Sequence, residues 1–94
     1  MFRIRERSHK TYESITRNGI KLSRRDDATN GLTTLSAIVL TLSDTQCRAV
    51  REISSEGQTV TVALQGRAAF MASDVHATAM KILGPLGVAC RIVI

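Results

Sequence analysis

The chain has 94 residues, enough for one small domain with its own core, and 44% of them are hydrophobic. Only three are aromatic, so we expect a core of aliphatic and alanine side chains. No run of 18 apolar residues is present, and residues 1–7 lack the apolar segment of a signal peptide, so we expect a cytoplasmic protein without a membrane span. The net charge of +5 favours an anionic partner.

Residues 11–25 have the pattern of a β-hairpin centred on Asn18-Gly19, the strongest short-range hairpin signal. A two-residue type I′ turn there would place Glu13 opposite Arg24, where the two charges would help to fix the pairing. An alternative interpretation is that the whole segment 1–31 is a basic flexible arm.

Residues 32–94 divide into strand, helix, strand, strand, helix and strand. This order predicts an α+β domain, a ferredoxin-like βαββαβ two-layer sandwich in which an antiparallel sheet carries two helices on one face, preceded by the basic hairpin or arm of residues 1–31. The expected strands are 37–42, 59–64, 67–72 and 88–94, and the expected helices are 44–55 and 74–84.

Capping and periodicity support both helices. Ser43 can cap the first while Gln46, three residues later, bonds back to it, and Cys47, Val50 and Ile53 then recur at helical spacing. For the second helix, Ser73 or Asp74 is the expected cap. Its expected buried stripe contains Val75, Ala79, Ile82, Leu83 and Leu86.

Two strands are expected at the edges of this sheet, Val88–Ile94 and Thr59–Leu64, and both are apolar. Neither contains the Pro or Lys that often protects an edge from pairing with another chain. We therefore expect one edge to be covered, either by the chain's own hairpin or by a second copy in a homodimer.

The positive charge is concentrated at the start of the chain. Residues 1–25 contain eight basic and two acidic residues, 8 − 2 = +6, whereas residues 26–94 contain five and six, 5 − 6 = −1. The candidate partner-binding residues are therefore Arg3, Arg5, Arg7, Lys10, Arg17, Lys21, Arg24 and Arg25. They would contact an acidic protein surface or the phosphates of a nucleic acid.

Aromatic residues decide between these two partners. RNA-binding sheets of this class stack bases on aromatic side chains of their central strands, and here only Phe70, on the predicted strand 67–72, qualifies. We therefore expect a small binding module that docks on a protein, as an inhibitor, adaptor or regulatory subunit of the kind that phages and mobile elements encode. A nucleic-acid-binding protein that uses the basic segment is the alternative.

No pattern in the sequence predicts catalysis, a metal or a cofactor. The possible ligands His9, Cys47, His76 and Cys90 lack paired spacing, so we expect no metal site and two free thiols. A Cys–His nucleophile pair stays open as the enzymatic alternative, although nothing in the sequence would activate it. No glycine-rich phosphate loop precedes a helix, and we expect a non-catalytic protein without a cofactor.

Overall fold

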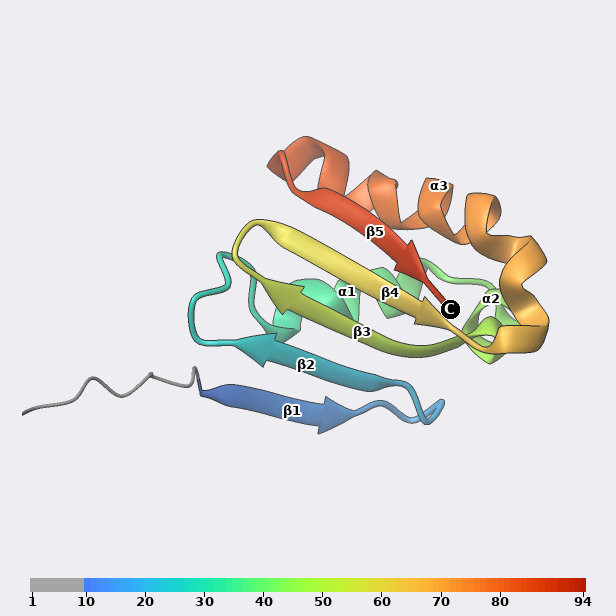
Figure 1. Ribbon diagram of the computed structural model, residues 1–94, viewed down its shortest axis with the longest axis horizontal. Coiled ribbons are helices and arrows are strands. Elements are labelled where there is room, and N and C mark those ends of the chain that lie inside the picture. Colours follow the sequence, from blue (N-terminus) through green and yellow to red (C-terminus); the bar gives the residue numbers. More distant parts are fainter. Residues whose placement is uncertain (1–9) are drawn as a thin grey trace, which may run out of the picture.

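The computed structural model describes residues 10–94, which form a five-stranded mixed sheet with its helices on one face (Figure 1). The strands lie side by side in chain order: β1 (Thr11–Ile15), β2 (Lys21–Arg25), β3 (Val50–Glu56), β4 (Thr59–Leu64) and β5 (Ala89–Val93). The helices are α1 (Leu32–Thr41), α2 (Asp44–Ala49) and α3 (Ala72–Leu83), and two 3-10 turns, η1 (Gly66–Met71) and η2 (Gly84–Leu86), flank α3.

The expected ferredoxin-like βαββαβ sandwich is wrong. β1 with β2 and β3 with β4 are antiparallel pairs, but β2 with β3 and β4 with β5 are parallel. Parallel neighbours require a crossover, because the chain must return to the end of the sheet from which it started. α1 and α2 make the first crossover and α3 makes the second, so the described chain has three helices instead of the expected two.

The N-terminal hairpin is confirmed, but its turn and register differ from the prediction. Thr16 N donates to Ile20 O at 2.9 Å and Gly19 N to Thr16 O at 2.9 Å, which makes a three-residue loop. Gly19 has φ +81°, whereas no non-glycine residue from 10 to 94, Asn18 included, has positive φ, so this is a turn with a bulge and not type I′. Glu13 consequently lies opposite Ser23, not opposite Arg24.

The expected strand 37–42 is instead the second half of α1. Leu35, Ile38 and Val39 on α1 are buried, as is Leu42 beyond its end, a helical spacing that continues upstream of the apolar run. Leu40, in the middle of the run, is 84% exposed. A short apolar run does not by itself distinguish strand from helix, and the crossover requirement decides for helix here.

The capping box of the expected helix 44–55 is confirmed, but the helix is only half as long. Gln46 N donates to Ser43 Oγ at 3.1 Å, and Ser43 N donates to Gln46 Oε1 at 2.9 Å. The helix then ends at Ala49, and Val50–Glu56 is a strand with a register shift between Val50 and Glu52.

The expected strand 67–72 is also wrong, because the chain does not return as a hairpin after β4. Gln65 N donates to Ala49 O at 2.8 Å, and η1 then leads into α3. The expected helix 74–84 is confirmed as α3, although Met71 occupies the N-cap position and Leu86 is exposed. The expected strands 59–64 and 88–94 are confirmed as β4 and β5.

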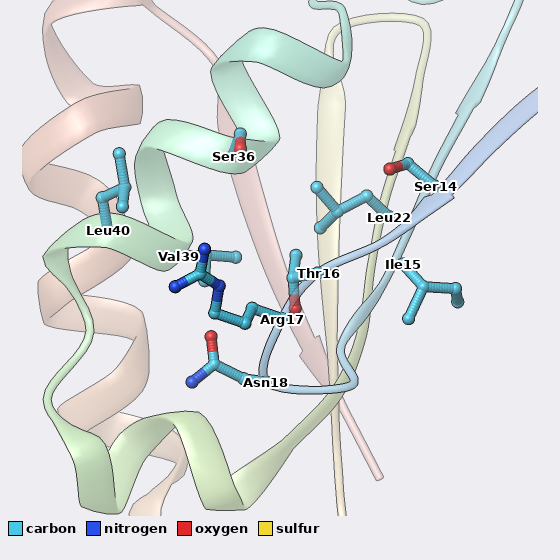
Figure 2. Close-up of a pocket in the computed structure, with 9 residues that line it drawn as sticks. All are labelled: Ser14, Ile15, Thr16, Arg17, Asn18, Leu22, Ser36, Val39 and Leu40. Carbon is cyan, nitrogen blue, oxygen red and sulfur yellow. The ribbon is translucent and has the colours of Figure 1, made fainter.

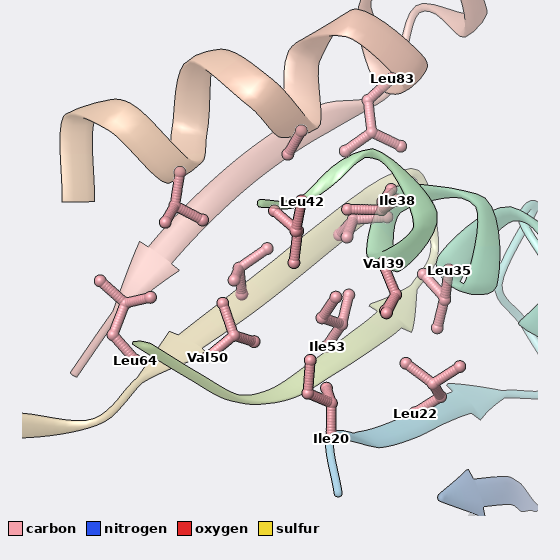
Figure 3. Packing of buried hydrophobic residues seen from close by; sticks show 14 of the residues in the cluster. Ile20, Leu22, Leu35, Ile38, Val39, Leu42, Val50, Ile53, Leu64 and Leu83 are labelled. Atoms are coloured by element: carbon pink, nitrogen blue, oxygen red, sulfur yellow. The ribbon is translucent and has the colours of Figure 1, made fainter. Parts of the chain in front are cut away.

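The core is aliphatic, as predicted, and lies between the sheet and the helices (Figure 3). Leu22 on β2, Ile53 on β3 and Val62 on β4 pair across the sheet and point towards the helices. The opposite, open face contains short polar and charged side chains of alternate residues, including Ser23, Ser54, Thr59 and Thr61.

One of the two predicted edge strands is at an edge of the sheet and the other is not. β5 is an edge, as predicted, but β4 is internal between β3 and β5, and β1 is the other edge among the described residues. The N-terminal hairpin joins the sheet next to β3, because its strand β2 pairs with β3. Among residues 10–94, no helix is long and apolar enough to cross a membrane.

Candidate protein-docking surfaces

The predicted basic residues do not form one patch. Arg3, Arg5 and Arg7 lie outside the described residues. On the open face of the sheet, Lys21 Nζ lies 3.2 Å from Glu13 Oε2. Arg25 Nη1 donates to Glu56 Oε2 at 3.0 Å. These pairs neutralise the open face of the hairpin, and both are partly solvated, so each stabilises the fold only modestly.

The Arg24 side chain points to the helix-covered face of the sheet, where it contacts other residues of the chain. Its Nη2 donates to Ala28 O at 2.8 Å, and its guanidinium carbon lies 5.8 Å from the centre of the Tyr12 ring. Its Nε is buried without a hydrogen-bond partner among the described residues. Arg24 therefore holds the β2–α1 connection. Of the predicted set, Lys10 and Arg17 are exposed and have no ion pair among the described residues.

A second group of cations, which the sequence analysis did not single out, surrounds Phe70. We call this surface the Phe70 corner: a shallow hollow of about 290 Å³ lined by Thr45, Arg48, Ala49, Arg67, Ala68, Phe70 and Met71. The Phe70 side chain is 85% exposed. Arg48 and Arg67 are exposed and have no ion pair within residues 10–94, and no carboxylate lines the hollow.

Local structure explains why these residues meet. Arg48 lies in the last turn of α2 and Arg67 near the start of η1, and the bond from Gln65 N to Ala49 O joins these two elements. Gln46 fixes α2 further, because its Nε2 donates to Asp74 Oδ2 at 3.2 Å and to Thr78 Oγ1 at 2.9 Å on α3. The corner is therefore built on anchored elements.

The net charge of a sequence segment does not reveal the Phe70 corner. The total of −1 over residues 26–94 averages Arg48 and Arg67 with carboxylates that lie elsewhere, such as Glu52 and Glu56 on the open face. The expected central strand 67–72 includes Phe70, whereas the structure places this residue in η1. The available signal was a rare aromatic residue within three residues of an arginine, in a segment that also contains glycine.

A groove separates the hairpin turn from α1 (Figure 2). We call it the hairpin groove; its volume is about 550 Å³, and it is lined by Ser14, Ile15, Thr16, Arg17, Asn18, Leu22, Ser36, Val39 and Leu40. Arg17 extends from the turn towards α1, while Ile15 points away from the helix. The groove combines the apolar side chains of Leu22 and Val39 with four uncharged polar residues and Arg17, which has no ion pair in the described part of the chain.

The cysteines show no sign of activation. Cys47 and Cys90 are free and half-buried, and burial raises the pKa of both thiols, with Asp44 adding to the effect at Cys47. His76 is exposed on α3. Within residues 10–94 no cluster of three or more His, Cys, Asp or Glu could hold a metal ion.

No protein family, curated protein or solved structure matches this chain.

Proposed function

We propose that this chain is a small non-catalytic binding module that acts by docking on another protein, as an inhibitor, adaptor or regulatory subunit in the cytoplasm. The observation that supports it most directly is the Phe70 corner. An aromatic side chain that is 85% exposed loses contact with water only when a partner covers it.

The composition of the corner matches that of protein interfaces. Aromatic residues, methionine and arginine are enriched at the centres of such interfaces, and Phe70, Met71, Arg48 and Arg67 are of these types. Because the lining of the hollow includes no carboxylate, and its two guanidinium groups have no ion pair in the described chain, the partner surface should present an apolar side chain between carboxylates.

The test is capture of partner protein from a nuclease-treated lysate by the immobilised chain. Variants distinguish specific binding at the Phe70 corner from nonspecific hydrophobic adsorption. Phe70→Ser should reduce the captured protein about tenfold or more, as loss of a central aromatic anchor does. Leu86→Ser is the matched control, because Leu86 is also exposed, at 56%, but lies outside the corner. Equal losses in both variants would contradict docking at Phe70.

Nucleic acid is the competing partner, since a base could stack on Phe70 while Arg48 and Arg67 contact phosphates. A fluorescent single-stranded oligonucleotide, titrated at physiological salt, separates the two. Submicromolar binding that Phe70→Ser and Arg67→Gln abolish would overturn protein docking in favour of the nucleic-acid alternative.

The proposal also includes a homodimer. Leu40, 84% exposed, stands at the rim of the hairpin groove, so an apolar projection and a groove that includes the apolar side chains of Leu22 and Val39 share one surface. That is the self-complementarity which a two-fold interface requires. Light scattering at micromolar concentration should show dimers that Leu40→Ser dissociates and Leu86→Ser does not; a monomer at every concentration would contradict this part.

A further inference from the structure

Within residues 10–94, β5 is an edge strand, so the backbone groups on its outer side have no neighbouring strand with which to pair. β5 pairs with β4 in parallel, and among the described residues no strand lies beyond it (Figure 1). Ala89 N donates to Gln58 O at 3.1 Å, so the N–H of Ala89 points towards β4.

Successive residues of a strand direct their N–H and C=O groups to opposite sides. Arg91 and Val93 therefore point their backbone groups to β4, as Ala89 does, while Cys90 and Ile92 point theirs outwards. These outward donors and acceptors are spaced as a strand of another chain needs them.

We infer that β5 accepts an extended segment of the partner protein as a sixth strand, by β-strand addition. This inference rests on the proposed function in one respect, namely that the partner is a protein. It adds the mode of binding and the sequence pattern of the segment that binds.

The side chains of β5 determine that pattern. Cys90 and Ile92 pair with the buried Val60 and Val62, so they face the helix side, where the neighbouring side chains of an added strand must be apolar. Arg91 is exposed on the open face and has no ion pair in the described chain. The added strand should therefore alternate aliphatic residues with carboxylates that reach Arg91.

The location of β5 agrees with docking at the Phe70 corner. β4 and β5 are parallel and η1 follows β4, so the carboxyl end of β5 and the corner lie at the same end of the sheet. Ile94, 57% exposed, continues β5 at that end. One partner can thus lay a strand along β5 and cover Phe70 with the part that follows.

The experiment is an NMR titration of the full chain with an eight-residue peptide of alternating valine and glutamate. The amide signals of Cys90 and Ile92 should shift and become protected from exchange, with a midpoint on the order of 1 mM. A peptide with lysine in place of glutamate should bind more weakly, because it meets Arg91 with like charge. Changes confined to β1, or none, would overturn the inference.

Proline supplies the sharpest variant. Ile92→Pro removes an outward N–H that the sheet itself does not use, whereas Ile92→Ala shortens the side chain and keeps the donor. Ile92→Ala should keep the peptide response and Ile92→Pro should lose it, while both retain the amide spectrum of the folded chain. If Ile92→Pro does not fold, Cys90→Pro against Cys90→Ala makes the same comparison.

Two further outcomes are informative. Signals of Cys90 and Ile92 that move with protein concentration alone would overturn the inference, because a second copy would then occupy the edge. Phe70→Ser should leave the peptide response intact. Failure at the edge and failure at the Phe70 corner are therefore observed separately.

Discussion

Val50 and Ile53 both point into the core from β3, although they are three positions apart along the chain. On a regular strand one of the two would face outwards. The register shift between Val50 and Glu52 makes Arg51 an extra residue that restores the inward direction.

Deleting Arg51 should therefore be tolerated about as well as substituting it. Without the extra residue Val50 still lies opposite Leu64 and Glu52 opposite Ala63, so Val50 and Ile53 keep their inward direction. Arg51→Ala removes the hydrogen bond from its Nε to Leu64 O and should cost about 1 kcal/mol. Deleting Ser54, in the regular part of β3, should instead cost about 2 kcal/mol or more in the free energy of unfolding, because a one-residue slip turns buried side chains to the open face. Urea titration measures all three variants; an Arg51 deletion as harmful as the Ser54 deletion would argue against the bulge.

Two leucines of α1 test whether this segment is a helix. Leu35 is fully buried and Leu40 is 84% exposed. Leu35→Ala should lower the free energy of unfolding by about 2–5 kcal/mol, whereas Leu40→Ala should change it by less than about 0.5 kcal/mol. The measurement belongs at submicromolar concentration, where self-association contributes little. Similar losses from both variants would restore the strand interpretation.

The correctly predicted elements are those whose sequence signals are local. The hairpin at Asn18-Gly19, the capping box at Ser43 and Gln46, and the stripe of α3 depend on residues within a few positions of one another. The two misassigned strands depend on pairing between distant segments: a parallel neighbour forces α1 at residues 37–41 and η1 at residues 66–71.

The bulge at Arg51 explains why the predicted helix 44–55 is too long. It gave β3 a three-residue spacing of buried side chains, which imitates a helix, so the predicted helix continued through Val50 and Ile53. The candidate site failed for a related reason. Arg48 and Arg67 become neighbours only after α2 and η1 are joined, and no window of sequence contains that contact.

Gly19 tests the hairpin turn. Its φ of +81° is strained for any side chain, and a β-branched one tolerates it least. Gly19→Val should destabilise the chain by about 1–2 kcal/mol. Gly66→Val is the control, because Gly66 has no positive φ and open space around its Cα. Thermal unfolding should separate the two variants, and no difference between them would contradict the turn assignment.

Gln46 is expected to contribute more to the free energy of unfolding than a helix cap alone. Ser43→Ala removes the cap alone and should cost about 1 kcal/mol. Gln46→Ala also removes the bonds to Asp74 and Thr78 that join α2 to α3, so its cost should be larger. Thr45→Ala, exposed on the same helix, is the control. A Gln46→Ala variant no less stable than Ser43→Ala would show that the bonds to α3 contribute little.

Because of the Cys90 thiol, we expect the free energy of unfolding to decrease at alkaline pH. Burial raises its pKa above the ordinary value of 9.0, so the folded state holds the proton more tightly than the unfolded chain. This stabilisation is complete below pH 9 and is lost as the pH rises through the folded-state pKa. The free energy of unfolding should therefore fall more steeply above pH 9 in the parent than in Cys90→Ala; parallel profiles would contradict it.

The order of the strands also decides where the chain can be attached to a surface or a label. β1 begins beside the end of β2 and the Gly57 turn, whereas β5 finishes at the end that carries α2 and η1 (Figure 1). A tag joined after Ile94 would therefore crowd both Phe70 and the outer side of β5. Immobilisation through the amino-terminal side, which enters the sheet at Thr11, leaves both surfaces facing solution.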